Sequence, residues 1–165
     1  MSPSASPAGH RDALAVLSIG SNLGDRLAYL QQAVEALAPR AVSGVFETAP
    51  WGDIEQDDFL NAVLLCDLDA TVAWDRAQQA ERRAGRERTF RWGPRTLDVD
   101  VVLARGPVPD GLVVPHPRAH ERAFVLAPWL DLDPDAVLPG HGAVAALLCE
   151  LGTGDVRRRD DLRLT

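Results

Sequence analysis

The stretch from Leu97 to Leu103 constrains the fold more than any other part of this 165-residue chain, because apolar residues alternate in it with Asp98, Asp100 and Val102. A period of two is typical of a half-buried β-strand, so the two aspartates share one face. Their Cα atoms are then roughly 6.6 Å apart. Two carboxylates at that separation repel by about 2.5 kcal/mol at an effective dielectric constant near 20. The pattern therefore favours either a fully solvated face or a bound cation.

An arginine-rich segment directly precedes this strand, and Gly85, Gly93 and Pro94 mark it as a loop. Its four arginines are Arg86, Arg88, Arg91 and Arg95. Guanidinium groups bind phosphate oxygens, and Mg²⁺ is commonly held by one or two carboxylates while substrate phosphates complete its shell. A magnesium and phosphate site and an ordinary solvated surface both remain open from the spacing alone.

The rest of the chain divides into short periodic segments. Strands are predicted at 13–20, 42–48, 59–68 and 97–103, and helices at 25–38, 71–84, 122–130 and 143–151. We expect Thr71 to cap the second helix and Pro128 to end the third. The second helix carries a narrow packing stripe made of Ala73, Ala77, Ala80 and Ala84. The charged run 157–159 is interpreted as solvated surface, because aspartates flank it.

The order strand, helix, strand, strand, helix, strand predicts an α+β fold. We expect a ferredoxin-like split βαβ sandwich, with a mainly antiparallel sheet and flanking helices on one face of it. The length suits a single domain over residues 13–165. Residues 1–12 are mostly Ser, Pro, Ala and Gly, and we expect them to form a disordered tail.

Composition excludes several function classes. The net charge of −7 argues against general nucleic-acid binding, and the absence of lysine excludes both a P-loop and Schiff-base chemistry. No apolar stretch has transmembrane length. Cys66 and Cys149 stand alone in apolar surroundings, so we interpret them as buried free thiols in a reducing compartment. We therefore expect a cytoplasmic protein without a membrane or nucleic-acid partner, and a monomer.

Three single residues allow a structural and a functional interpretation. Trp51 either packs on the base of the exposed loop 49–58 or covers a ring-shaped ligand. Asn61 interrupts an apolar strand and must find hydrogen-bond partners, either in the neighbouring backbone or in a ligand. His116 lies between Pro115 and Pro117, a rigid corner that suits a surface loop or a phosphate donor.

The segment Arg-Trp-Gly-Pro-Arg-Thr-Leu-Asp-Val-Asp, from Arg91 to Asp100, closely resembles the signature of the 6-hydroxymethyl-7,8-dihydropterin pyrophosphokinase family. Further segments resemble other parts of that family in the same order. They are Ser18–Arg26, Phe59–Ala62, Val114–His116 and Arg122–Pro128. The resemblance extends from about Leu14 to Leu148, which is nearly the whole chain apart from its tails.

This resemblance implies transfer of a diphosphate from ATP to 6-hydroxymethyl-7,8-dihydropterin, with AMP as the second product, in folate biosynthesis. It implies two Mg²⁺ ions on Asp98 and Asp100, and catalytic roles for Arg86 and Arg95. The ATP contacts would be Arg88, Trp92, Arg95, His116 and Arg122, and the pterin contacts Thr48, Trp51, Phe59, Asn61 and Phe124. Two alternatives stay open at this point. One is a magnesium-dependent nucleotidyl or phosphoryl transferase acting on another small alcohol, and the other is a non-catalytic nucleotide-binding module.

Overall fold

The computed structural model describes residues 13–50, 56–85 and 96–164. The predicted tail at residues 1–12 lies outside this part of the chain. In order, the described elements are β1 (Ala15–Ser21), α1 (Arg26–Leu37), β2 (Ala41–Val42), β3 (Phe46–Thr48), β4 (Phe59–Cys66), α2 (Ala70–Arg83), β5 (Asp98–Ala104), the short 3-10 helix η2 (Ala119–Glu121), α3 (Ala123–Leu132), β6 (Val137–Leu138), β7 (Gly142–Ala143), α4 (Val144–Leu151) and β8 (Arg157–Arg158).

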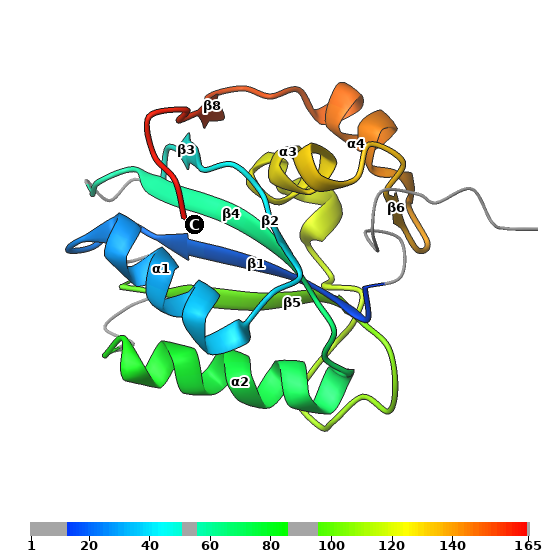
Figure 1. Ribbon diagram of the computed structural model, residues 1–165. Helices are drawn as coiled ribbons and strands as arrows, with labels where there is room; N and C mark the ends of the chain where they lie inside the picture. The colour runs from blue at the N-terminus through cyan, green and yellow to red at the C-terminus, as the bar shows by residue number, and fades with distance from the viewer. Residues whose placement is uncertain (1–12, 51–55, 86–95, 165) are drawn as a thin grey trace, which may run out of the picture.

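One antiparallel sheet organises the molecule (Figure 1). Its strand order is β5-β1-β4-β3-β8, and β2 also pairs with β4. Strands β6 and β7 form a separate two-stranded sheet. In the main sheet, the first and third strand segments of the chain lie at the centre, and the second and fourth lie outside them. This order confirms the predicted α+β, ferredoxin-like fold.

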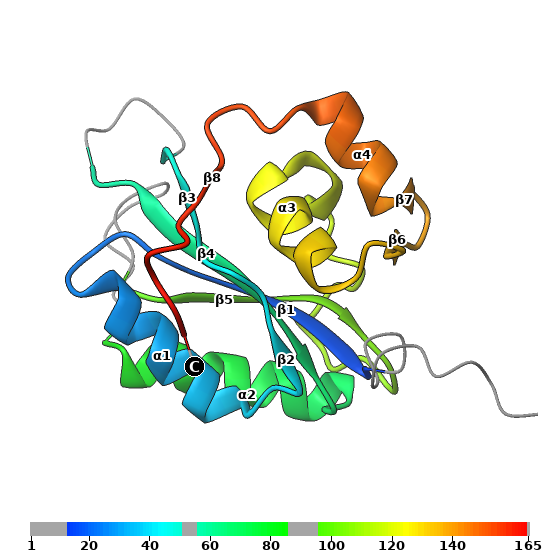
Figure 2. The same cartoon turned by 45° about the horizontal axis from the view of Figure 1, so that its top comes forward.

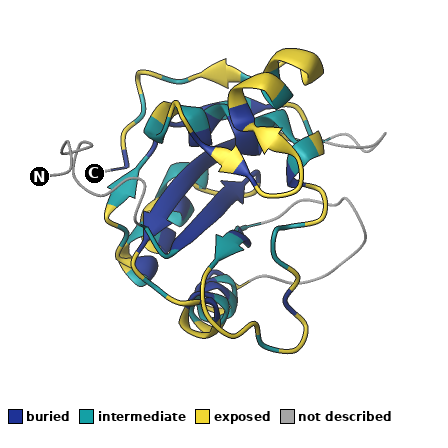
Figure 3. Cartoon of the chain, turned by 90° about the vertical axis from the view of Figure 1, so that its right-hand side faces the viewer, coloured by how far each residue is buried: buried dark blue, intermediate teal, exposed yellow. Residues whose placement is uncertain are grey.

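Helices cover both faces of the main sheet, so the prediction that they lie on one face is wrong (Figures 1 and 2). Helices α1 and α2 pack on one face, and α3, with α4 against it, packs on the other. The central strands are consequently buried on both sides (Figure 3). Residues of the α1/α2 core include Leu17, Leu64 and Val99, and residues of the α3 core include Val16, Val63 and Val102. A strand covered on both faces needs apolar residues at successive positions, which explains the continuous apolar run of β4.

Short polar side chains determine where the first two helices begin. Asp25 accepts a hydrogen bond from the Ala28 N–H (3.1 Å) at the start of α1. Asp69 accepts one from the Val72 N–H (3.0 Å) at the start of α2, so the prediction that Thr71 caps this helix is wrong. Aspartate is the better cap here because its extended backbone places the carboxylate over the first free N–H groups. The alanine stripe of α2 is buried, as predicted.

The predicted strand at 42–48 is divided into β2 and β3. Between them, the Ser43 N–H donates to the Val63 carbonyl (3.0 Å), and the Ser43 hydroxyl accepts from the Val63 N–H (2.9 Å). The Gly44 N–H donates to an Asp131 carboxylate oxygen (2.7 Å). A side chain of α3 therefore takes the place of a ladder partner at this point, and the regular pairing is interrupted.

Two further expectations are corrected on the α3 side. Helix α3 continues past Pro128 to Leu132. Its own residues Leu126 and Trp129 are buried, and the free energy of this packing outweighs the cost of the hydrogen bond that proline cannot donate. Cys149 is exposed on α4, and only Cys66 is a buried thiol. Burial is the main cause that raises the pKa of Cys66 to about 12.

The charged run at the carboxyl end is not merely solvated surface. Although Arg157 and Arg158 are exposed, they form β8, an edge strand that pairs with Phe46 and Glu47 of β3. The sequence interpretation missed this because the pairing joins segments about 110 residues apart, and a two-residue strand has no periodicity to recognise.

Candidate active site

The two aspartates of β5 lie on the sheet face that α3 covers. Val99 and Val101 point into the α1/α2 core, so Asp98 and Asp100, which alternate with them along β5, face the other way, as their spacing predicts. The Arg122 side chain donates from Nη1 to Asp100 Oδ2 (3.2 Å). Arg122 immediately precedes α3, so the sheet supplies the carboxylates and the start of the helix supplies a cation.

Strand pairing arranges the site as a row across the sheet. Gly20 of β1 lies opposite Asp98 on one side and Asn61 on the other. A Cβ atom on Gly20 would lie 3.1 Å from Asn61 Oδ1 and 3.6 Å from Cδ1 of Phe59. The missing side chain therefore lets Asn61 Oδ1 and the Phe59 ring approach the β1 backbone closely, next to the acidic strand.

Asn61 is buried, with 2% of its surface exposed, and its side-chain nitrogen is hydrogen-bonded within the sheet. Its Nδ2 donates to Thr48 Oγ1 (2.9 Å) and to the Phe46 carbonyl (3.4 Å), both on β3. Its Oδ1 consequently faces Gly20. The functional and structural interpretations of this residue are compatible, because Nδ2 is hydrogen-bonded to β3 while Oδ1 points toward Gly20.

A pocket of about 380 Å³ adjoins this row. Thr48, Arg122 and Phe124 line it together with residues 151–156. The Arg122 guanidinium lies 5.5 Å from the centroid of the Phe124 ring, a distance typical of a cation–π contact. An aromatic face, a cation and a hydroxyl therefore border one cavity, which suits a flat polar ligand.

His116 lies next to β5, beside the carboxylate of Asp100. Its backbone N–H donates to the Val102 carbonyl of β5 (2.9 Å), and its Nδ1 accepts from the Arg118 N–H (3.2 Å). Burial is the main cause that lowers the pKa of His116, the Asp100 carboxylate opposes it, and Arg122 and Arg118 lower it further. The imidazole is therefore neutral at neutral pH and carries its proton on Nε2, where it can donate.

The structure thus brings together eight of the predicted site residues on one sheet face and around its pocket. They are Thr48, Phe59, Asn61, Asp98, Asp100, His116, Arg122 and Phe124. Five others, Trp51, Arg86, Arg88, Trp92 and Arg95, lie outside the described residues.

The sequence of this chain is similar to those of known proteins. Residues 16–134 match the family described as 7,8-dihydro-6-hydroxymethylpterin-pyrophosphokinase. The chain belongs to this family. A protein of Mycobacterium leprae named 2-amino-4-hydroxy-6-hydroxymethyldihydropteridine pyrophosphokinase is 50% identical, over 91% of this chain and 87% of its own length. Proteins of the same name from Mycobacterium tuberculosis (47% identical, 90% and 88% covered) and Bacillus subtilis (41% identical, 72% and 77% covered) are also similar.

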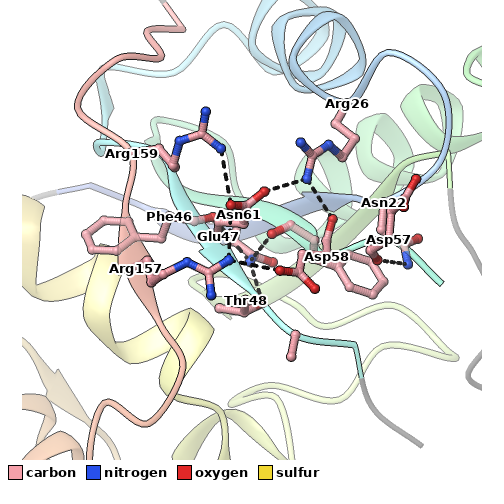
Figure 4. Close-up of polar contacts among 12 residues, drawn as sticks. Asn22, Arg26, Phe46, Glu47, Thr48, Asp57, Asp58, Asn61, Arg157 and Arg159 are labelled. Atoms are coloured by element: carbon pink, nitrogen blue, oxygen red, sulfur yellow. Dashed lines mark hydrogen bonds and ion pairs between the residues drawn. The ribbon is translucent and has the colours of Figure 1, made fainter. Parts of the chain in front are cut away.

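For this member of the pyrophosphokinase family, sequence reasoning missed an ion-pair cluster at the β3 edge of the sheet, on the α1 face and next in sequence to Thr48 (Figure 4). Glu47, whose side chain is 13% exposed, lies at its centre. It accepts hydrogen bonds from Arg26 (2.7 Å), Arg157 (3.1 Å) and Arg159 (3.1 Å). The only local signal was Glu47 itself, a charged residue inside a predicted strand.

Proposed function

We propose that this protein transfers a diphosphate from ATP to 6-hydroxymethyl-7,8-dihydropterin, and that the reaction takes place on the sheet face beneath α3. The observation that carries the proposal is the row formed by Asp98, Gly20 and Asn61. Asp98 and Asn61 are two strand spacings apart, about 10 Å. A flat ring anchored at Asn61 can therefore lie over Gly20 and direct its hydroxymethyl group toward the carboxylates.

The pterin ring binds between Phe59 and Phe124 in this proposal. Asn61 Oδ1, which lies beside Gly20, accepts a hydrogen bond from an N–H of the ring. Thr48 holds the other side of the same amide at 2.9 Å, so the acceptor is fixed before the substrate arrives. We also propose Trp51 as a pterin contact, on the resemblance alone.

Asp98 and Asp100 fit two Mg²⁺ ions by their chemistry, because both present carboxylate oxygens on one partly exposed face. Within the described residues, no group of three or more His, Cys, Asp or Glu side chains forms a candidate metal site. Phosphate oxygens of ATP would therefore have to complete the coordination shell. Bound there, Mg²⁺ would neutralise phosphate charge and lower the pKa of the attacking hydroxyl.

The cationic and donor residues of the chain hold the triphosphate. Arg122 offsets the carboxylate charge at Asp100, and its guanidinium borders the pocket, so it can also contact phosphate. His116 donates from Nε2 as a neutral group. By the resemblance, Arg88, Trp92 and Arg95 also bind ATP, and Arg86 and Arg95 stabilise charge on the transferred group.

The chemical step itself needs alignment and charge neutralisation more than covalent help. The substrate hydroxyl oxygen forms a bond to the β-phosphorus of ATP. The bond from that phosphorus to the oxygen of the α-phosphate breaks, AMP leaves with the bridging oxygen, and the hydroxyl proton is released to solvent.

Product analysis tests this proposal directly. Incubation with ATP, Mg²⁺ and the pterin alcohol should give AMP and the pterin diphosphate in equal amounts, and omission of the pterin should abolish AMP formation. Release of ADP or pyrophosphate would support a different phosphoryl or nucleotidyl transferase, and nucleotide binding without turnover would support a binding module. Either result would overturn the assignment.

The setting of the enzyme is part of the proposal. No helix among the described residues is long and apolar enough to cross a membrane. ATP as co-substrate and the buried free thiol of Cys66 support a location in the cytoplasm. We propose a monomer with ATP and the pterin as its partners.

A further inference from the structure

The segment that follows α4 returns to the pterin side of the sheet. Through β8 it pairs with β3, placing Arg157 opposite Glu47. Its residues 152–156 line the same pocket as Thr48 and Phe124. The segment is therefore both the outer edge of the sheet and one wall of the proposed pterin pocket.

Arg157 bridges the two ends of the connection between β3 and β4. Its Nη2 donates to Glu47 Oε1 (3.1 Å) and to Asp58 Oδ2 (2.9 Å), as Figure 4 shows. Glu47 directly precedes Thr48, and Asp58 directly precedes Phe59. One guanidinium group thus links the side chains that flank two proposed pterin contacts, in addition to the backbone pairing of Thr48 with Phe59.

Asp155 holds the residue on the other side of Thr48. Its Oδ2 accepts a hydrogen bond from the Ala49 N–H at 2.6 Å. Side chains of one short segment therefore contact both neighbours of Thr48, at the Glu47 carboxylate and at the Ala49 backbone N–H. A carboxylate accepting a backbone N–H is a charge-assisted bond, about twice as strong as a neutral one.

Glu47 makes this anchoring firm. Burial raises the pKa of its carboxyl, but the hydrogen bonds from Arg26 and the two other arginines outweigh burial and lower it below the usual value. The group is therefore ionised at neutral pH. Arg26 Nη1 also donates to the Asp58 carbonyl (2.9 Å), so the α1 side of the sheet reinforces the contact that Arg157 makes.

We propose that Asp155 and Arg157 are positioning residues for the pterin pocket. The proposal rests on the proposed function, because it assumes that Thr48 and Asn61 border the pterin. Thr48 Oγ1 accepts a hydrogen bond from Asn61 Nδ2. A shift of β3 against β4 would therefore move the Asn61 amide, which we propose binds the pterin ring. The carboxylates of β5 are separated from β3 by β1 and β4, so the shift should not reach them.

The test compares Arg157→Ala, Arg157→Lys and Asp155→Ala with wild type. Arg40→Ala is the matched control, because Arg40 pairs with Asp67 (3.0 Å) at the opposite end of β4. Calorimetry gives the dissociation constants for the pterin alcohol and for a non-hydrolysable ATP analogue, and hydrogen exchange reports the Ala49 amide. Since displacements of about 1 Å can cost about a hundredfold in activity, we expect the two alanine variants to bind the pterin about five- to thirtyfold more weakly.

ATP-analogue binding should stay within about twofold in every variant, the lysine variant should recover part of the pterin affinity, and the Ala49 amide should exchange faster in Asp155→Ala. Unchanged pterin affinity in both alanine variants, or an equal loss in the control, would overturn the positioning role. Failure of the proposed function looks different: wild type itself would then give no pterin-dependent AMP. If wild type is active and both alanine variants bind the pterin as tightly as wild type does, only the positioning role is overturned.

Discussion

Replacing Gly20 with alanine tests the geometry of the site most directly. The new Cβ would lie 3.1 Å from Asn61 Oδ1, and all three of its nearest neighbours, Asn61, Phe59 and the Leu60 carbonyl, belong to β4. Contacts this short require the neighbour to move by a few tenths of an ångström. The amide cannot retreat freely, because its nitrogen is bound to Thr48 at 2.9 Å. The oxygen must therefore turn away from the space over the glycine.

The expected loss follows from that displacement. A buried hydrogen bond to the pterin that is lost or left unsatisfied costs about 1–3 kcal/mol, and 1.4 kcal/mol is a tenfold change, so pterin affinity should fall about 5- to 150-fold. The fold should tolerate the change, because Gly20 does not have the positive φ that favours glycine. Replacing such a glycine gains about 0.4–1 kcal/mol from the unfolded state, which offsets strain. The melting temperature should stay within about 4 °C.

Titration calorimetry with the pterin and with an ATP analogue is the appropriate assay. Because the added methyl leans toward β4 and not toward Asp98 on β5, nucleotide affinity should be unchanged. A double-mutant cycle with Asn61→Ala isolates the mechanism: Gly20→Ala should cost much less once the amide is absent. Unchanged pterin affinity, or strictly additive losses in the cycle, would refute the reasoning.

Four further outcomes are expected. Asp98→Ala and Asp100→Ala should each abolish Mg²⁺-dependent turnover while circular dichroism stays native, because each removes a metal-site carboxylate and not a core residue. Phe124→Ala should weaken pterin binding by about 1–3 kcal/mol in calorimetry and leave the ATP analogue unaffected. Arg86→Ala should lower kcat about a hundredfold with little change in KM, as steady-state kinetics would show, if it contacts only the transferred charge. Because the Glu47 pKa is depressed from its ordinary value of 4.5, wild type should be more stable than Glu47→Gln above that pH, and their difference in melting temperature should shrink as pH falls through the lower, folded-state pKa.

Sequence patterns that span only a few residues predicted most of the sheet and the acidic part of the candidate site. The alternation around Asp98 and Asp100 gave their common face correctly, because a strand fixes side-chain direction within two residues. The buried alanine stripe of α2 could also be predicted, because it follows from the spacing of residues within one helix. The ferredoxin-like order followed from the succession of elements, which leaves few allowed topologies.

The side of the sheet that α3 and α4 cover could not be predicted in the same way. Their helices are largely apolar, and such a pattern says that a helix is covered without saying by what. The continuous apolar run of β4 carried the missing information, because only a strand buried on both faces needs it. That run requires a second layer of structure on the face opposite α1 and α2.

The pocket wall was the least predictable part, for a reason that also bears on its function. Arg157 reaches Glu47 and Asp58 across 110 and 99 residues of chain, and its local sequence indicated only surface. A single exposed ion pair contributes little to stability. Several cations that share one partly buried carboxylate form a more rigid network, and three arginines do so at Glu47. Closing such long loops costs entropy that the contacts must repay on folding. The contacts meet beside Thr48 and Phe59, where even a small displacement would move the proposed pterin-binding amide, and this location favours a positioning role over simple stabilisation.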